Sequence, residues 1–432
     1  MPDPSDAGLN PVLAGTAVEQ TRVGPRMEFL DALRGLAAMC VVVQHSLELL
    51  SPTWAKFSLE HFRLGEYGVV VFFLCSGFII PASIERQGSQ MRFWVGRLFR
   101  LYPLYLSVLA AVLVLHYGFD KYPLPQAYLD SPVKATLVNA TMLQNFVLGP
   151  QYLALGQSWS LAYELVFYGL VSALFVVGWH KRSLLWSALG FLLAMVVNTR
   201  HVPTEAIRQF LDNGGARVPA IAVGALVVGV GVTVWATRHA GPQRWLSILI
   251  VAASILLVLN RPETLSLAMF FFGTLFFGTC LYRWLHGDLS NRAILGIAGL
   301  GALAIVVFWV TADIYWAPLP DGVSVGSFKT AEITTFLAAY ATFGLALLVR
   351  QRKFPTWVLW LGTISYSLYL VHAIPIYAFG HVTGNRVADF TIWVGAAIVI
   401  SAGTYYGIEQ PAIRAGRTLS KRAAAPWAAR ST

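Results

Sequence analysis

The stretch FLDALRGLAAMCVVVQHS, residues 29–46, is apolar enough to enter a bilayer, yet it carries Asp31, Arg34 and His45. On a helix that turns about 100° per residue, His45 points within about 20° of Arg34 and about 40° of Asp31. At about 1.5 Å rise per residue, Arg34 and His45 lie roughly 16 Å apart along the axis. Ionisable groups are costly inside a membrane and usually serve a function there. The stretch therefore predicts a transmembrane helix with a polar stripe. The alternative is that Asp31 and Arg34 anchor the helix at the interface and His45 hydrogen-bonds a neighbouring helix.

The composition of the whole chain indicates a membrane protein. Of its 432 residues, 56% are hydrophobic and only 12% are charged, whereas soluble proteins carry about 25% charged residues. We expect an all-α, polytopic transmembrane helical bundle embedded in a lipid bilayer. The three cysteines, Cys40, Cys75 and Cys280, lie in apolar runs without paired spacing, which argues against a disulfide framework or a zinc site, and we expect no bound metal.

Twelve apolar runs predict the membrane spans, although the short run at 245–259 makes ten or eleven spans an alternative. The runs lie at 29–50, 68–84, 100–117, 160–179, 184–198, 218–236, 245–259, 264–282, 292–311, 332–349, 357–379 and 390–407. Lys and Arg gather in the loops on one side, so the net charge of +10 indicates membrane orientation and no nucleic-acid partner. We expect both termini in the cytoplasm and a multi-pass location in the cell (inner or plasma) membrane.

The parts outside the spans are short. Residues 1–25 are expected to be a disordered tail, 26–413 the transmembrane domain, and 414–432 a basic cytoplasmic tail without structure. The longest gap, 118–159, falls outside the cell in this topology. Its sequence VKATLVNATMLQNFV is a candidate to cover an outer cavity.

Two further segments place charged groups on helix faces. In FWVGRLFRLYPLYL, Arg97 and Arg100 are three residues apart, so both guanidinium groups can reach one phosphate-bearing ligand, or they can merely anchor the span. In SWSLAYELVFYGL, Ser160, Glu164 and Tyr168 recur every four residues and share one face. Glu164 is a natural partner for His45, or makes a structural hydrogen bond.

Several of these motifs resemble the acyltransferase 3 family. LDALRGLAAMCVVVQH resembles its first helix, in which an arginine (Arg34) is followed by ten residues and a histidine (His45). SGF at Ser76, followed by the R-x-x-R-x-x-P arrangement of Arg97 and Arg100, is similar to its second and third helices. The segment around Glu164 resembles its W-S-L-x-x-E-x-x-F-Y element. LGTISYSLYLVH resembles its G-x-x-S-Y-x-x-Y-L-x-H element and places His372, which would otherwise be interpreted as a satisfied buried histidine. The closing GIEQP is similar to its I-E-x-P, with Glu409 as an anchor.

The resemblance implies an integral membrane O-acyltransferase. In that family the arginine pair is associated with the cytoplasmic acyl donor, so Arg97 and Arg100 would bind acyl-CoA, with acetyl-CoA the first candidate, as a co-substrate and with no bound cofactor. The acceptor would be a hydroxyl of a glycan or a glycosylated small molecule.

Acyl transfer to a hydroxyl needs a base, and His45 is the best one in the sequence. The alternative is that His45 first takes the acyl group itself, and the sequence does not distinguish the two. Glu164 or Glu48 would orient His45, and Arg34 and Asp31 would line the path to the donor. Ser160, Tyr168, Ser76 and His372 are further candidates. The alternative function is a proton-coupled transporter or flippase, which a buried set of His, Glu and Arg would also suit.

Overall fold

The computed structural model describes residues 27–196, 204–207, 209, 217–237, 243–312 and 319–428, and every regular element within them is a helix. The first half contains α1 (Glu28–Leu50), α2 (Pro52–His61), α3 (Leu64–Gln87), α4 (Gln90–Phe119), α5 (Gln126–Asp130), α6 (Pro132–Ala140), α7 (Gln144–Val147), η1 (Pro150–Tyr152), η2 (Gly156–Ser158), α8 (Trp159–Val176) and α9 (Ser183–Val196). The second half contains α11 (Arg217–Ala236), α12 (Gln243–Leu259), α13 (Leu265–Leu285), α14 (Asn291–Thr311), α15 (Val325–Leu348), α16 (Thr356–Thr363), α17 (Ser365–Val371), α18 (Ala373–Phe379), α19 (Arg386–Thr404), the π-helix η3 (Tyr405–Glu409) and α20 (Gln410–Ala428).

The helices confirm a multi-pass, all-α membrane bundle. Within the described residues, eight helices are long and apolar enough to cross a membrane, and a ninth span arises if α16 and the following segment, which are bent by 58°, count as one. Each of the twelve predicted apolar runs overlaps a helix. In three of these helices, α9, α11 and α12, the apolar stretch is shorter, at Ser183–Val196, Val223–Trp235 and Arg244–Leu259. The difference from twelve therefore lies in helix length.

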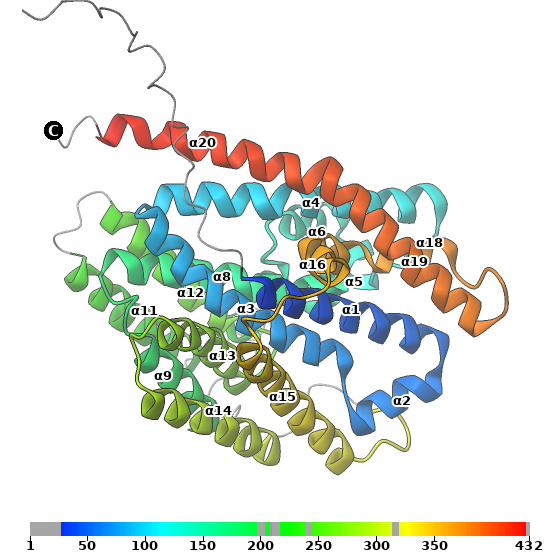
Figure 1. Cartoon of the computed structure of the whole chain (residues 1–432), viewed down its shortest axis with the longest axis horizontal. Coiled ribbons are helices and arrows are strands. Elements are labelled where there is room, and N and C mark those ends of the chain that lie inside the picture. The colour runs from blue at the N-terminus through cyan, green and yellow to red at the C-terminus, as the bar shows by residue number, and fades with distance from the viewer. Residues whose placement is uncertain are drawn as a thin grey trace, which may run out of the picture.

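Helix α3 lies in the middle of the bundle, packed against α1, α13 and α15 (Figure 1). Glycines allow this close approach. A Cβ atom on Gly77 would lie 1.8 Å from the carbonyl oxygen of Leu275, and one on Gly278 would lie 2.4 Å from that of Leu74. Small residues at such crossings are how membrane helices gain contact, because lipid provides no hydrophobic drive between them. The crossing fixes α3, which carries Ser76.

The start of α4 is determined by a local signal. The Ser89 side chain accepts a hydrogen bond from the backbone N–H of Arg92, as an N-cap residue does. With the helix beginning at Gln90, Arg97 and Arg100 fall in its second and third turns. This position brings both arginines next to the middle of the bundle.

The C-terminal segment differs from expectation. Residues from Arg414 were expected to be unstructured, and this expectation is wrong as far as Ala428, because α20 continues the chain as a helix. Figure 1 shows α20 running beside α4 along one edge of the bundle. A Cβ on Gly416 would lie 2.5 Å from the Cβ of Phe99, so glycine permits this contact too. The predicted disordered residues 1–25 lie outside the described part of the chain.

The predicted extracellular gap folds into short helices, α5 to η2. Asn139 within it is fully buried, and its side chain donates hydrogen bonds to the carbonyl oxygens of Ala135 and Tyr152 at 2.8 Å each. Gln157, near its end, donates to the carbonyl oxygen of Leu370 at 2.8 Å. The gap is thus tied to α17, which ends directly before His372.

Membrane orientation gives a first testable prediction. We expect both termini in the cytoplasm, because the basic loops then share one side. Reporter fusions within residues 120–158 should report an extracytoplasmic position, and fusions after Arg422 a cytoplasmic one. A C-terminal fusion that reports the extracytoplasmic side would contradict an even number of spans.

Candidate active site

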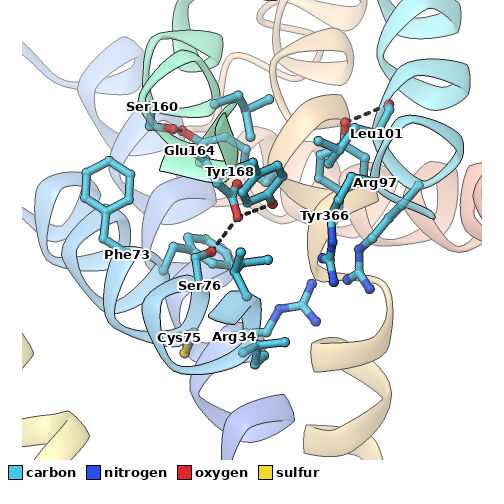
Figure 2. Close-up of a pocket in the computed structure, with 16 residues that line it drawn as sticks. Arg34, Phe73, Cys75, Ser76, Arg97, Leu101, Ser160, Glu164, Tyr168 and Tyr366 are labelled. Atoms are coloured by element: carbon cyan, nitrogen blue, oxygen red, sulfur yellow. Dashed lines mark hydrogen bonds between the residues drawn. The ribbon is translucent and has the colours of Figure 1, made fainter. Parts of the chain in front are cut away.

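The first cavity, here called the arginine cavity, lies among α1, α3, α4, α8 and α17 (Figure 2). It gathers most of the polar residues singled out in the sequence, together with two tyrosines of α17. Its polar lining consists of Arg34, Ser76, Arg97, Arg100, Ser160, Glu164, Tyr168, Tyr366 and Tyr369. Residues more than 330 positions apart in the chain thus meet at one site.

Three guanidinium groups give the arginine cavity its positive charge. Arg97 donates a hydrogen bond to the Ser83 hydroxyl at 2.9 Å, and its guanidinium carbon lies 5.6 Å from the centre of the Tyr168 ring. Among the described residues, no ion pair or hydrogen bond engages the guanidinium of Arg34 or Arg100. Figure 2 shows the guanidinium groups of Arg34 and Arg97 turned toward one another. Such a cluster suits an anionic ligand with several phosphates.

Glu164 lies across the arginine cavity from these cations. Its Oε1 accepts hydrogen bonds from the Ser76 hydroxyl at 2.5 Å and the Tyr168 hydroxyl at 2.6 Å. The predicted pairing of Glu164 with His45 is therefore wrong, because both donors come from the arginine cavity and His45 lies in another cavity. The Ser160, Glu164 and Tyr168 face predicted from helical spacing does line one cavity.

Glu409 is a neighbour of this site whose placement the sequence did not indicate. It is 2% exposed, lies in the π-helix η3, and accepts a hydrogen bond from the Ser367 hydroxyl at 2.8 Å. Single-turn π-helices often occur at functional sites. Glu409 interacts electrostatically with Arg34 and Arg100, so it helps to balance their charge. The sequence predicts Glu409 as an anchor. The I-E-x-P motif, in which Glu409 lies two residues before Pro411, is its one signal.

A second cavity, here called the histidine cavity, lies toward the end of α1 opposite Arg34. Its polar lining is Gln44, His45, Glu48, Arg63, Glu66, Gln157, Trp159 and Tyr369. Arg63 is paired with Glu66 and Glu332. Burial acts to lower the pKa of Arg63, but these two carboxylates outweigh it and hold the pKa above its usual value. The ion pair of Arg63 with Glu332 joins the start of α3 to α15 beside the cavity.

His45 is hydrogen-bonded to His372. The Nδ1 atom of His45 lies 2.8 Å from Nε2 of His372, and the two rings are parallel within 4° with centres 5.0 Å apart. The in-plane geometry is that of a direct N–H···N hydrogen bond. His372, at the break between α17 and α18, is thus the partner of His45, in place of Glu164 or Glu48. The Glu48 carboxylate instead accepts from the Gln44 amide.

A backbone carbonyl determines which nitrogens carry the protons. Nδ1 of His372 lies 2.8 Å from the carbonyl oxygen of Tyr369, which can only accept, so this Nδ1 is protonated. In the neutral ring, Nε2 of His372 is then the acceptor, and Nδ1 of His45 must donate to it. The lone pair of His45 is therefore on Nε2. Among the described residues, no hydrogen bond engages this nitrogen, so it can accept a proton from a group in the histidine cavity.

Asp31 lies apart from both cavities. The backbone of Asp31 packs on α16, where a Cβ on Gly362 would lie 1.9 Å from the Asp31 carbonyl oxygen. Its charge acts on Arg34. Of the predicted stripe, Arg34 therefore lines the arginine cavity and His45 lines the histidine cavity. Asp31 lies at the crossing of α1 and α16.

The two cavities together suit a two-substrate reaction. A neutral imidazole with a free Nε2 can take a proton from a polar group in the histidine cavity. The guanidinium groups can hold an anionic second substrate in the arginine cavity. In the described part of the chain, no three His, Cys, Asp or Glu residues gather as metal ligands.

Comparisons with known proteins agree with the sequence motifs. Residues 27–407 match the family described as an acyltransferase domain. The chain is 28% identical over 183 residues to the acyltransferase MdmB of Streptomyces mycarofaciens. This match covers 40% of this chain and 45% of that protein. It is 24% identical over 410 residues to the peptidoglycan O-acetyltransferase OatA of Listeria monocytogenes, which covers 88% of this chain and 55% of that protein. The chain thus spans about half the length of these relatives. No solved structure matches it significantly.

Proposed function

Because the chain belongs to the acyltransferase 3 family, we propose that it is an integral membrane O-acyltransferase. It transfers an acetyl or other short acyl group from cytoplasmic acyl-CoA to a hydroxyl of a carbohydrate or glycosylated acceptor at the extracytoplasmic side of the cell membrane. The observation that carries this proposal is the pair of neighbouring cavities, one with three guanidinium groups and one with the His45–His372 pair.

The arginine cavity is the proposed donor site. Arg97 and Arg100 would donate charge-assisted hydrogen bonds to the phosphates of acyl-CoA. Arg34, which comes from a different helix, would donate to a phosphate or to the thioester carbonyl oxygen. Arg34 lies near the start of α1 and His45 near its end. The thioester would therefore approach the histidine cavity from the side at which α1 and α4 begin.

The histidine cavity is the proposed site of proton transfer. His45 Nε2 takes the proton of the acceptor hydroxyl while the hydroxyl oxygen attacks the thioester carbonyl carbon. The C–S bond of the tetrahedral intermediate then breaks, and the thiolate leaves and takes the proton from His45 as the free CoA thiol. While His45 is an imidazolium, its Nδ1–H bond to His372 becomes charge-assisted and stabilises the cation. The product is the acyl ester of the acceptor.

Purified protein tests this proposal. With acyl-CoA and a panel of carbohydrate acceptors, we expect release of CoA and an acyl ester product by mass spectrometry. Peptidoglycan fragments belong in the panel, because one relative is named a peptidoglycan O-acetyltransferase. A transporter without bond chemistry would release no CoA. In sealed vesicles, acyl-CoA should be used only from the cytoplasmic face, with product formed across the bilayer. Turnover with both substrates confined to the cytoplasmic side would contradict the sidedness alone.

His372 gives a prediction about positioning. His372→Ala removes the acceptor that holds the His45 tautomer, so we expect kcat to fall at least about tenfold. His372→Gln can still accept from His45 Nδ1 through its amide oxygen and should restore part of the activity. The measurement is kcat and acceptor KM for both variants at equal amounts of folded protein. Equal losses in the two variants would contradict the positioning role.

A further inference from the structure

Among the described residues, the arginine cavity and the histidine cavity share a single lining residue, Tyr369. Tyr369 is 4% exposed and lies on α17, one turn before His372. Its ring packs edge-on against Phe72, with centres 5.5 Å apart. Tyr369 therefore forms part of the wall between the two cavities.

The Tyr369 hydroxyl is held by one group from each side of this wall. It donates to the carbonyl oxygen of Gln157 at 2.7 Å and lies 2.7 Å from the Ser160 hydroxyl, from which it can accept. Gln157 lines the histidine cavity, and Ser160 lines the arginine cavity. The two hydrogen bonds fix the ring in the position that separates the cavities.

An aromatic cluster forms another part of the wall. Phe73 lines the arginine cavity and meets Trp159 of the histidine cavity edge-to-face, with ring centres 6.5 Å apart. Both rings also pack on Phe271, at 5.2 Å and 5.7 Å between centres. Each ring also contacts Tyr163, so moving either ring would disrupt three aromatic contacts. Displacing the Tyr369 ring breaks two hydrogen bonds and its ring contacts with Phe72 and His372, and leaves the Phe73, Trp159 and Phe271 cluster in place.

We propose that Tyr369 is the gate between donor and acceptor, and that it determines whether the acyl group is passed to the acceptor or lost to water. The residue has this role in acyl transfer only if the chain uses acyl-CoA as proposed above. With Tyr369 closed, the thioester is kept from the polar histidine cavity. When the acceptor is bound, the ring swings aside and the acyl group reaches His45.

The side reaction that the gate prevents is hydrolysis. His45 Nε2 can deprotonate water as it deprotonates a hydroxyl. The water oxygen then attacks the thioester carbonyl carbon, the C–S bond breaks, and the products are the free carboxylic acid and CoA thiol. Exclusion of water from a reactive group is a general task of closed active sites.

The ratio of acceptor-independent CoA release to ester formation tests the gate, and this ratio does not depend on how much protein is folded. Tyr369→Phe keeps the ring but loses the hydrogen bonds, so we expect the ratio to rise about 3- to 10-fold. Tyr369→Ala removes the wall and should raise it further. Tyr340→Phe is the matched control, because it removes a partly buried hydroxyl 2.6 Å from that of Thr274, outside the lining of both cavities. An unchanged ratio in Tyr369→Ala, with ester formation intact in the unmodified protein, would overturn the inference and leave the acyltransferase proposal standing.

Cysteine labelling tests the wall without any turnover. The background protein has Cys40, Cys75 and Cys280 replaced by alanine. In sealed vesicles, Glu48→Cys in the histidine cavity first identifies the side from which a membrane-impermeant thiol reagent reaches that cavity. The reagent is then added on that side. Ser76→Cys, in the arginine cavity, should then be labelled only when Tyr369→Ala is also present. Equal labelling of Ser76→Cys with Tyr369 intact, or no labelling after its removal, would show that Tyr369 does not separate the cavities. This result is obtained even if acyl-CoA is not the donor.

Discussion

Replacing His45 by alanine is expected to reduce acyl transfer by about 10² to 10⁴ while the protein stays in the membrane. The reason is that Nε2 of His45 carries the lone pair of the imidazole and lines the histidine cavity, since Nδ1 is engaged by His372. The measurement is the rate of ester formation at saturating acyl-CoA. Loss of a base should lower kcat with little change in the donor KM, because His45 does not line the arginine cavity.

His61→Ala serves as the control for this experiment. His61 is an exposed histidine on α2 whose ring stacks on Phe57, so its removal should leave the rate unchanged. The abundance of each variant in the membrane shows whether it folds. If His45→Ala keeps most of its activity at normal abundance, the assignment of the base is wrong.

Arg100→Ala is expected to raise the KM for acyl-CoA about 10- to 150-fold, which corresponds to the loss of charge-assisted hydrogen bonds worth about 1.5 to 3 kcal/mol. Arg100 is a cleaner probe than Arg97, because Arg97 is also bonded to Ser83 and packed against the rings of Phe93 and Tyr168. Arg100→Lys keeps the charge but loses the planar fork, so we expect an intermediate KM.

A donor without the nucleotide makes this prediction sharper. Acyl-pantetheine lacks the nucleotide phosphates, so Arg100→Ala should hardly change its KM. Arg92→Ala, at an exposed position in the first turn of the same helix, should leave both KM values unchanged. An Arg100→Lys variant with an unaltered KM for acyl-CoA would instead favour a role for Arg100 in anchoring α4.

The sequence predicted the helices better than the tails. Each apolar run predicted from hydropathy overlaps a helix, because membrane helices must be apolar along most of their length. The same measure failed at α20, whose polar, basic sequence gives no hydrophobic signal. That helix packs on α4, with Gly416 against Phe99, and such a contact depends on the fold as a whole.

Within the site, helical spacing predicts which side chains share a helix face. It predicts neither how deeply each side chain is buried nor which side chains of other helices contact it. The spacing of Ser160, Glu164 and Tyr168 correctly put them on one face, and Arg97 and Arg100 reach the same cavity. Spacing does not show that Glu164 and His45 lie in different cavities, so the predicted pairing of these two residues is wrong. His372 was found only through its family motif, because one histidine in an apolar run carries no sign of its partner.

The carbonyl of Tyr369 sets the proton arrangement of the two histidines, whereas its side chain stands between the cavities. Position 369 thus carries two tasks in two chemically separate parts of one residue. Any amino acid supplies the carbonyl, so substitution of the side chain at this position leaves the tautomers of His372 and His45 unchanged. The passage between the cavities can therefore be altered by design through one ring, while the unprotonated nitrogen of His45 stays the same.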